Sequence, residues 1–162
     1  MFFFLVNNEY DQVCGKRYVL MEKQMNYLLA QVACCEIGMR LLSVETLEEQ
    51  KCLEKTYSTR IANNGCVWTS GTDLGCEGRY RWCGSNASMY TSSNLAWMSG
   101  EPNDYLEDED CLVLWNFNGE LKLNDELCLE PFSFICEDID DPKKASPQDS
   151  RPPDFINKIR PR

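Results

Sequence analysis

Residues 101–111 of this chain read Glu-Pro-Asn-Asp-Tyr-Leu-Glu-Asp-Glu-Asp-Cys, and they carry the most specific signal in the sequence. Six of the first ten residues are carboxylates, and no Lys or Arg lies among them. Like charges at this density repel one another, so a folded domain needs a counter-ion there. Carboxylate and amide oxygens are hard ligands of the kind that Ca²⁺ prefers. The run therefore predicts a calcium site, to which Asn124 and Asp125 can add further oxygens.

Ten cysteines surround this run in the sequence. An even number of cysteines spread over one domain is typical of disulfides in an oxidising compartment, so we expect a secreted, extracellular protein. A zinc site would need close Cys-x-x-Cys pairs or histidines, and the chain has neither. The apolar residues 1–6 end too early for a signal-peptide core, and we interpret them as a truncated or missing signal peptide.

Bulk properties favour one folded domain followed by a tail. The chain has 162 residues, 43% of them hydrophobic, and its net charge of −10 argues against nucleic acid or an anionic membrane as the partner. We expect an N-terminal segment at 1–12, a domain at 13–137 and a disordered tail at 138–162. The tail is predicted because five of the seven prolines lie after residue 141. No apolar run is long enough for a transmembrane helix.

Hydrophobic periodicity and turn residues predict an α+β domain, with helices first and short antiparallel strands after them. The expected helices are 25–38 and 45–57. The expected strands are 41–44, 66–70, 111–115, 120–123 and 132–136, with a hairpin turn at Asn118-Gly119. Residues 71–94 are rich in Gly, Ser, Asn and Thr and are predicted to form a long functional loop. This loop holds a sequon at Asn86, which is either glycosylated or unused.

The motifs together resemble those of a C-type lectin domain from about Cys14 to Glu137. Trp97 lies four residues before the tripeptide Glu101-Pro102-Asn103, which is similar to the mannose-type (EPN) tripeptide of that family. Glu109-Asp110-Cys111 and Phe134-Ile135-Cys136-Glu137 also match family motifs. Leu123 stands where the family has a Trp before Asn124-Asp125, a change that removes a packing residue and no ligand. The doubled Cys34-Cys35 and the cysteine-rich loop are similar to those of some invertebrate single-domain members.

The resemblance implies a disulfide-stapled C-type lectin fold whose long loop binds calcium and sugar. Its implied primary Ca²⁺ ligands are Glu101, Asn103, Glu109, Asn124 and Asp125. The first four of these would also hydrogen-bond two adjacent hydroxyls of mannose, N-acetylglucosamine or fucose. The family uses a cis Glu101–Pro102 bond to turn the flanking side chains toward the ion. An accessory calcium site at Asp73, Glu77, Asp104 and Asp110 is implied as well, with ordinary surface acids as the alternative.

The family also implies two disulfides, Cys34–Cys136 and Cys111–Cys128. Cys76 and Cys83 flank a short excursion of the chain, and we expect them to pair locally. Four cysteines then remain with three possible pairings, which the sequence leaves open: Cys14, Cys35, Cys52 and Cys66.

We therefore expect a calcium-dependent carbohydrate-binding protein, of a kind that can serve innate immune recognition. The first alternative is a calcium-independent protein-binding module on the same fold, since a fold does not determine its function. The second is a glycoside hydrolase that uses paired carboxylates. The hydrolase is disfavoured because the chain has no His and no indication of an apolar pocket around the acids.

Overall fold

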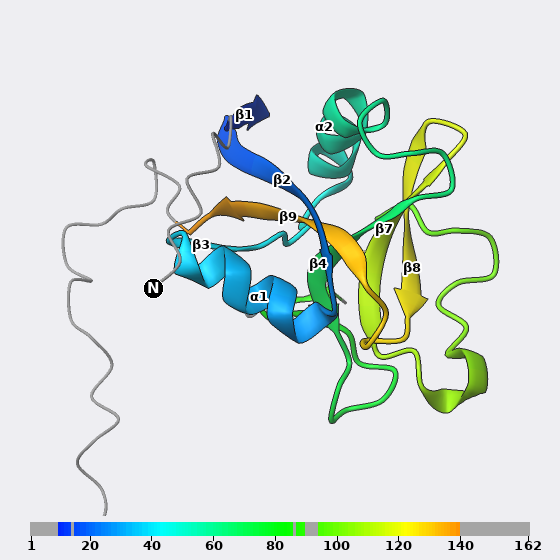
Figure 1. Cartoon of the computed structure of the whole chain (residues 1–162). Helices are drawn as coiled ribbons and strands as arrows, with labels where there is room; N and C mark the ends of the chain where they lie inside the picture. The colour runs from blue at the N-terminus through cyan, green and yellow to red at the C-terminus, as the bar shows by residue number, and fades with distance from the viewer. Residues whose placement is uncertain (1–9, 14, 86, 90–93, 140–162) are drawn as a thin grey trace, which may run out of the picture.

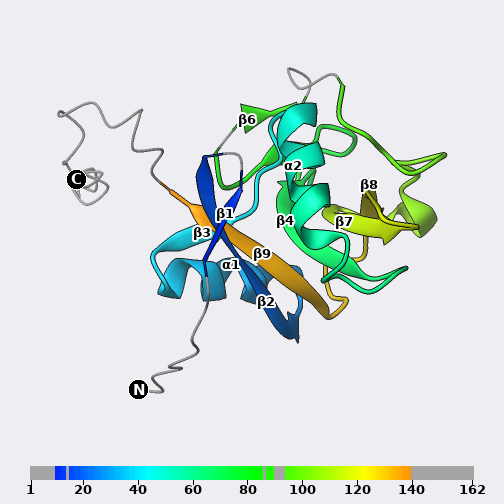
Figure 2. The same cartoon turned by 90° about the horizontal axis from the view of Figure 1, so that it is seen from above.

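The computed structural model describes residues 10–13, 15–85, 87–89 and 94–139. Two helices, α1 (Tyr27–Glu36) and α2 (Leu47–Tyr57), lie on either side of the strand β9 (Phe132–Asp138) in both Figure 1 and Figure 2. The α+β class predicted from the sequence is confirmed. Within the described residues, neither helix is long and apolar enough to cross a membrane. The tail predicted at 138–162 lies, from residue 140 on, outside the described residues.

All the strands belong to one mixed sheet in which β9 is central. Along one edge β9 pairs antiparallel with β2 (Lys16–Met25), which in turn pairs with β1 (Asp11–Val13). The short β3 (Met39–Leu41) pairs with the end of β9 on the edge opposite β2, since Glu137 pairs with both Tyr18 and Arg40. On the other side β9 runs parallel to β4 (Cys66–Thr72), which continues the sheet into β7 (Cys111–Phe117) and β8 (Glu120–Glu126). The prediction of purely antiparallel strands is therefore wrong for the β4–β9 pair.

Local signals position the helices and the main hairpin. The Asn26 side chain accepts a hydrogen bond from the Leu29 N–H at 3.0 Å and begins α1, and Gly38 follows its end with φ +73°. The Thr46 hydroxyl caps α2 in the same way, by accepting from the Glu49 N–H. Asn118 and Gly119 have positive φ values and join β7 to β8, as an Asn-Gly hairpin turn requires.

Three elements differ from the predictions. β3 begins at Met39, earlier than the strand predicted at 41–44, because Gly38 turns the chain directly onto β9. The β1–β2 hairpin was not predicted, since Tyr18, Val19 and Leu20 are all buried and show no alternation. The predicted 71–94 loop contains two short strands, β5 (Arg81–Trp82) and β6 (Ala87–Ser88).

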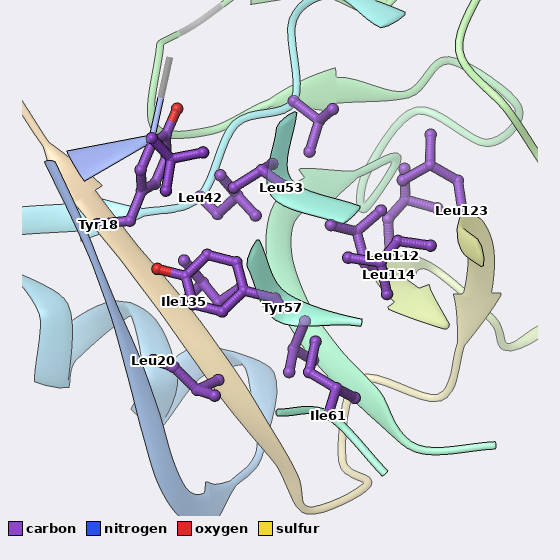
Figure 3. Packing of buried hydrophobic residues seen from close by; sticks show 14 of the residues in the cluster. Tyr18, Leu20, Leu42, Leu53, Tyr57, Ile61, Leu112, Leu114, Leu123 and Ile135 are labelled. Carbon is purple, nitrogen blue, oxygen red and sulfur yellow. The ribbon is translucent and has the colours of Figure 1, made fainter. Parts of the chain in front are cut away.

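Two hydrophobic cores form on the two faces of the sheet. Figure 3 shows the core under α2, where Leu53 and Tyr57 of the helix meet Leu112, Leu114 and Ile135 of the strands. The intervening strand residues point to the opposite core, under α1, which is built from Tyr27, Ala30, Trp68, Val113 and Phe134, among others. Because successive strand residues face opposite sides, each central strand contributes to both cores.

A buried carboxylate and an exposed ion pair hold the ends of the domain together. Glu137 of β9 is fully buried, and its carboxylate accepts hydrogen bonds from Arg40 Nε at 2.8 Å and from the Ser43 N–H at 3.0 Å. One residue on, Asp138 forms an ion pair with Arg17 of β2 at 2.6 Å. The described chain therefore enters and leaves the domain at the same edge.

The two disulfides implied by the resemblance are confirmed. Cys34 of α1 is bonded to Cys136 of β9, and Cys111 of β7 is bonded to Cys128. Cys52 also takes part in a disulfide. The pairing left open for Cys14 lies outside the described residues.

The predicted Cys76–Cys83 bond is wrong, because both thiols are free. β5 pairs with β4, and the Cys83 N–H donates to the Ser70 carbonyl, so Cys83 lies beside the body of β4. Cys76 lies beyond the end of β4, in the turn that follows Asp73. Cys35 and Cys66 are free as well, so four described cysteines carry thiols.

Loop length predicts the relative contributions of the two bridges to stability. Cys34–Cys136 closes 102 residues and Cys111–Cys128 closes 17. Replacing each pair by Ala should lower the unfolding free energy by about 4–5 and about 3 kcal/mol respectively, measured by denaturant titration without calcium. The control Cys35→Ala should change it little, since that exposed thiol is free. A larger loss from the shorter loop would contradict this ranking.

Candidate metal centre

The predicted primary ligands come from one loop and one strand. Glu101 and Asn103 lie in the loop before a short 3₁₀ turn, η2 (Tyr105–Glu107), and Glu109 follows that turn. Asn124 and Asp125 lie in β8, opposite Val113 and Leu112 of β7. The hairpin therefore presents the Asn-Asp pair to the acidic loop.

Asp125 fastens the loop to the sheet. Its carboxylate is fully buried and accepts hydrogen bonds from the Asn103 N–H, at 3.0 and 3.2 Å to its two oxygens, and from the Asp104 N–H at 2.7 Å. The Glu101–Pro102 peptide bond just before these residues is cis, as the resemblance implied. The structure thus brings Glu101, Asn103 and Asp125 together.

Glu109 and Asn124 complete the group. Glu109 Oε2 accepts a hydrogen bond from the Tyr105 N–H at 3.0 Å, so its side chain turns back toward the loop. The Asn124 amide nitrogen donates to the Asp125 carbonyl at 2.8 Å and to Glu126 Oε1 at 3.2 Å. Because the amide nitrogen donates within the protein, the amide oxygen is the atom of Asn124 that could serve as a ligand. All five predicted residues therefore belong to one neighbourhood.

The electrostatics of this neighbourhood fit a cation. Glu101 Oε2 is buried and has no hydrogen-bond partner among the described residues. Burial raises the pKa of Glu101, and the hydrogen bond and charge of Asp125 raise it further. Burial likewise raises the pKa of Glu109, as do the charges of Asp125, Glu101 and Asp104. A divalent cation would satisfy the lone oxygen and relieve the repulsion, so the residues present fit Ca²⁺.

A second acidic group lies nearby. Carboxylate oxygens of Asp73, Glu77 and Asp110 all lie within 4.8 Å of one another. Asp73 is buried, and its Oδ1 has no hydrogen-bond partner in the described structure, while its Oδ2 accepts from the Gly78 N–H at 2.8 Å. Burial and the Asp73 charge raise the pKa values of Glu77 and Asp110. Asp104, the fourth predicted residue, is outside this group, and its Oδ1 accepts from the Glu109 N–H at 3.3 Å.

One residue of the site was missed at the sequence level. Glu126 accepts from the Asn124 amide and is half-buried. Burial, followed by the charge of Glu109, raises its pKa to about 7. The feature of the sequence that could have identified Glu126 is its position directly after Asn124-Asp125. The sequon residue Asn86 lies outside the described residues.

The exposed rim of the site is apolar. Tyr105 and Leu106 are 65% and 79% exposed. Their backbone is held by Glu109 and by the Glu107 N–H, which donates to the Asp104 carbonyl at 2.9 Å.

Comparisons with known proteins identify the family of this chain. The model of the Lectin C-type domain family matches residues 23–138. A C-type lectin, lectoxin-Enh4 of Pseudoferania polylepis, is 31% identical over 127 residues, which cover 77% of this chain and 76% of the relative. A C-type lectin mannose-binding isoform of Oxyuranus scutellatus is 29% identical over 76% of this chain and 77% of its own length.

Solved structures give the same answer. The carbohydrate-recognition domain of cow CD23, solved in the presence of a GlcNAc2Man3 oligosaccharide, superposes with a TM-score of 0.65 at 29% identity, over 80% of this chain and 95% of that one. The mouse scavenger receptor C-type lectin domain gives a TM-score of 0.68 at 23% identity, over 79% and 93% of the two chains, and supports the fold alone. The matched family consists of non-enzymatic binding domains, which argues against the hydrolase alternative. On the family match, the relatives and the fold together, this chain belongs to the C-type lectin domain family.

Proposed function

We propose that this protein binds mannose-type sugars through a calcium ion held by Glu101, Asn103, Glu109, Asn124 and Asp125. The observation that carries the proposal is the buried Glu101 Oε2, which lacks a hydrogen-bond partner in the described structure beside the buried Asp125. Leaving such an oxygen desolvated costs free energy unless a cation or a donor meets it. Calcium is the cation that this all-oxygen donor set prefers.

In the proposed complex, both the ion and the side chains contact the sugar. Bound calcium would take two adjacent sugar hydroxyls as ligands. Glu101 and Glu109 carboxylates can accept hydrogen bonds from those hydroxyls, and the Asn103 and Asn124 amides can take part as donor or acceptor. The arrangement selects sugars whose neighbouring hydroxyls have the right relative orientation, as in mannose, N-acetylglucosamine and fucose.

Two relatives support the sugar class. One is named as a mannose-binding isoform, and the cow CD23 domain was solved in the presence of a mannose-containing oligosaccharide. The disulfides Cys34–Cys136 and Cys111–Cys128 fit the oxidising, extracellular compartment in which glycans are displayed.

We further propose that Asp73, Glu77 and Asp110 hold a second calcium ion, with Asp104 beside them. Its role would be structural, because Asp73 begins the excursion that leads to β5 and its N–H donates to the Asp110 carbonyl. An ion there would join that excursion to the acidic run. Asp73 Oδ1, buried without a hydrogen-bond partner in the described residues, is the oxygen that the ion would stabilise most.

The calcium proposal predicts a stability gain that depends on Asp125. Calcium at a hundredfold excess over its Kd should stabilise the fold by about 2.7 kcal/mol, which raises the melting temperature. Asp125→Asn keeps an acceptor for the loop N–H groups but removes the charge, so it should lose most of the calcium-induced shift and all binding to a mannose column. The control Asp108→Asn, an exposed acid in the same run, should behave as wild type.

The same experiment separates the lectin from a protein-binding module on this fold. A lectin should elute from the mannose column when a chelator is added. Calorimetry that shows no calcium binding at millimolar ion would reject the proposal and favour the calcium-independent alternative.

The tripeptide predicts a switch in specificity. The double variant Glu101→Gln with Asn103→Asp keeps the total charge but exchanges which position can donate a hydrogen bond. It should prefer galactose over mannose, because galactose-type family members carry Gln-Pro-Asp here. Competition with free monosaccharides measures the preference, and the calcium-induced melting shift should persist. If mannose remains preferred, these two residues do not read the hydroxyl orientation.

Acid should act in opposite directions with and without calcium. Burial raises the pKa values of Glu126 and Glu137 to about 7, above the ordinary 4.5, so their charged forms destabilise the ion-free fold. Without calcium, lowering the pH from 8 toward 5 should therefore raise the melting temperature. The extra shift produced by calcium should shrink over the same range, because protonated carboxylates cannot serve as ligands.

Glu126→Gln isolates one of these groups. It should flatten part of the ion-free pH profile, whereas Glu22→Gln, at an exposed position on β2, should leave the profile unchanged. A melting temperature that falls steadily on acidification without calcium would show that these two carboxyls do not control the profile.

A further inference from the structure

The outer edge of β8 is covered by a segment that leads to the candidate metal centre. β7 pairs with one edge of β8, and residues 94–98, which we call the strap, run along the other. The Leu123 side chain points into the core under α2 (Figure 3), and its backbone faces the strap. Its N–H donates to the Ala96 carbonyl at 2.9 Å, and its carbonyl accepts from the Met98 N–H at 2.9 Å. The strap therefore satisfies backbone groups that an open strand edge would leave unpaired.

Gln50 of α2 joins the helix to the strap. The residue is only 1% exposed. Its Nε2 donates to the carbonyls of Ala96 at 2.8 Å and Leu121 at 3.0 Å, and its Oε1 accepts from the Ala96 N–H at 2.8 Å. Both hydrogens of the side-chain amide and its oxygen are therefore used. One buried side chain thus connects α2, the strap and β8.

The two segments that Gln50 connects both lead to proposed calcium ligands. β8 continues along the same strand into Asn124 and Asp125. The strap continues through a tight turn, in which the Glu101 N–H donates to the Met98 carbonyl at 3.2 Å. Gln50 therefore fixes the strap against β8 just before each of them reaches the candidate metal centre.

We propose that Gln50 is a positioning residue of the candidate metal centre, which sets the place of Glu101 relative to Asn124 and Asp125. The inference rests on the proposed function, because it assigns a further residue to the same site. The hydrogen bonds of Gln50 go to Ala96 and to β8, so it acts through the backbone of the strap. Residues that orient the ligands of a metal commonly control its affinity without touching it.

The loop of the centre is then held at two points of different kinds. After Glu101, the Asn103 and Asp104 N–H groups donate to Asp125, a carboxylate that would itself bind the ion. Before Glu101, the bonds of Gln50 involve backbone groups and no proposed ligand. This first point of attachment is independent of the ion and holds the Glu101 segment in place before the ion arrives. The free-energy cost of ordering the site on binding is lower as a result.

Glu54 offers a matched comparison on the same helix. It lies one helical turn after Gln50, and its Oε2 accepts from the Leu121 N–H at 3.0 Å. Both side chains therefore join α2 to the same residue of β8, but only the Gln50 amide also holds Ala96. A difference between variants at these two positions isolates the contact with the strap.

The first test uses the full chain without calcium. Amide hydrogen exchange, measured with a chelator present, should show the Met98 N–H protected in the wild type. Gln50→Met keeps the length of the side chain but removes its donors and acceptor, so exchange at Met98 should become about tenfold faster or more, relative to the amides of β4. Glu54→Met should leave that ratio unchanged. Gln50→Asn keeps the amide, shortens its reach by a methylene, and gives the same comparison where the Met variant does not fold.

The second test measures calcium binding by calorimetry at a temperature at which every variant is folded. The calcium Kd of Gln50→Met should be about tenfold higher than that of the wild type or more, because the Glu101 segment is no longer held in place. Glu54→Met should keep a Kd within about twofold of the wild type. Val19→Ala, which opens a cavity in the core under α1, should lower the melting temperature and likewise leave the Kd unchanged.

The outcomes separate this inference from the proposed function. Exchange at Met98 that is no faster in Gln50→Met than in Glu54→Met would overturn the inference, and so would equal calcium affinities of these two variants. A wild type that binds no calcium, but in which Gln50→Met speeds exchange at Met98 as expected, would reject the proposed function alone. Gln50 would then still set the place of the Glu101 segment beside β8.

Discussion

The pairing of β9 with its neighbours is the constraint on which the rest of the structure depends. β9 is bonded to β2 at one edge and to β3 and β4 at the other, so it joins the N-terminal half of the domain to the hairpin that carries Asn124 and Asp125. Its Ile135 enters one core while Phe134 and Cys136 enter the other. The Cys34–Cys136 bond and the buried Glu137 then attach α1 and Arg40 to the same strand.

The candidate metal centre is built at the far end of this sheet, where structural and functional roles meet in one side chain. Asp125 is buried like a core residue, yet it is also the acceptor for the backbone of the 103–104 segment. The carboxylate that would bind the ion therefore also fixes the conformation of the loop. Burying several acids around Glu101 is unfavourable without a cation, which links the fold of the loop to ion binding.

Short-range signals in the sequence predicted the parts of the fold that they control. The Asn118-Gly119 turn and the Gly38 stop are confirmed, and the resemblance supplied the two disulfides. The pairing of strands that lie far apart in the sequence could not be predicted from it. Tyr18, Val19 and Leu20 are buried by β9, more than a hundred residues away, and the buried Trp82 belongs to a strand of only two residues. Cys76 and Cys83 failed as a pair for the same reason, because β4 decides where Cys83 lies.

The ion pair between Arg17 and Asp138 has a mechanical consequence. It shows that β2, near the start of the domain, and β9, its last strand, are neighbours whose outer ends meet at one corner. A force that pulls these ends apart would load the hydrogen bonds between β2 and β9 one after another, as a zip opens, and would not shear them all at once. The disulfide from Cys34 to Cys136 ties α1 to β9, so tension would pass along β2 and α1 to Cys34 and across the bond to Cys136. The residues between Cys34 and Cys136, which include the hairpin that carries Asn124 and Asp125, would therefore lie outside the covalent path that bears the tension.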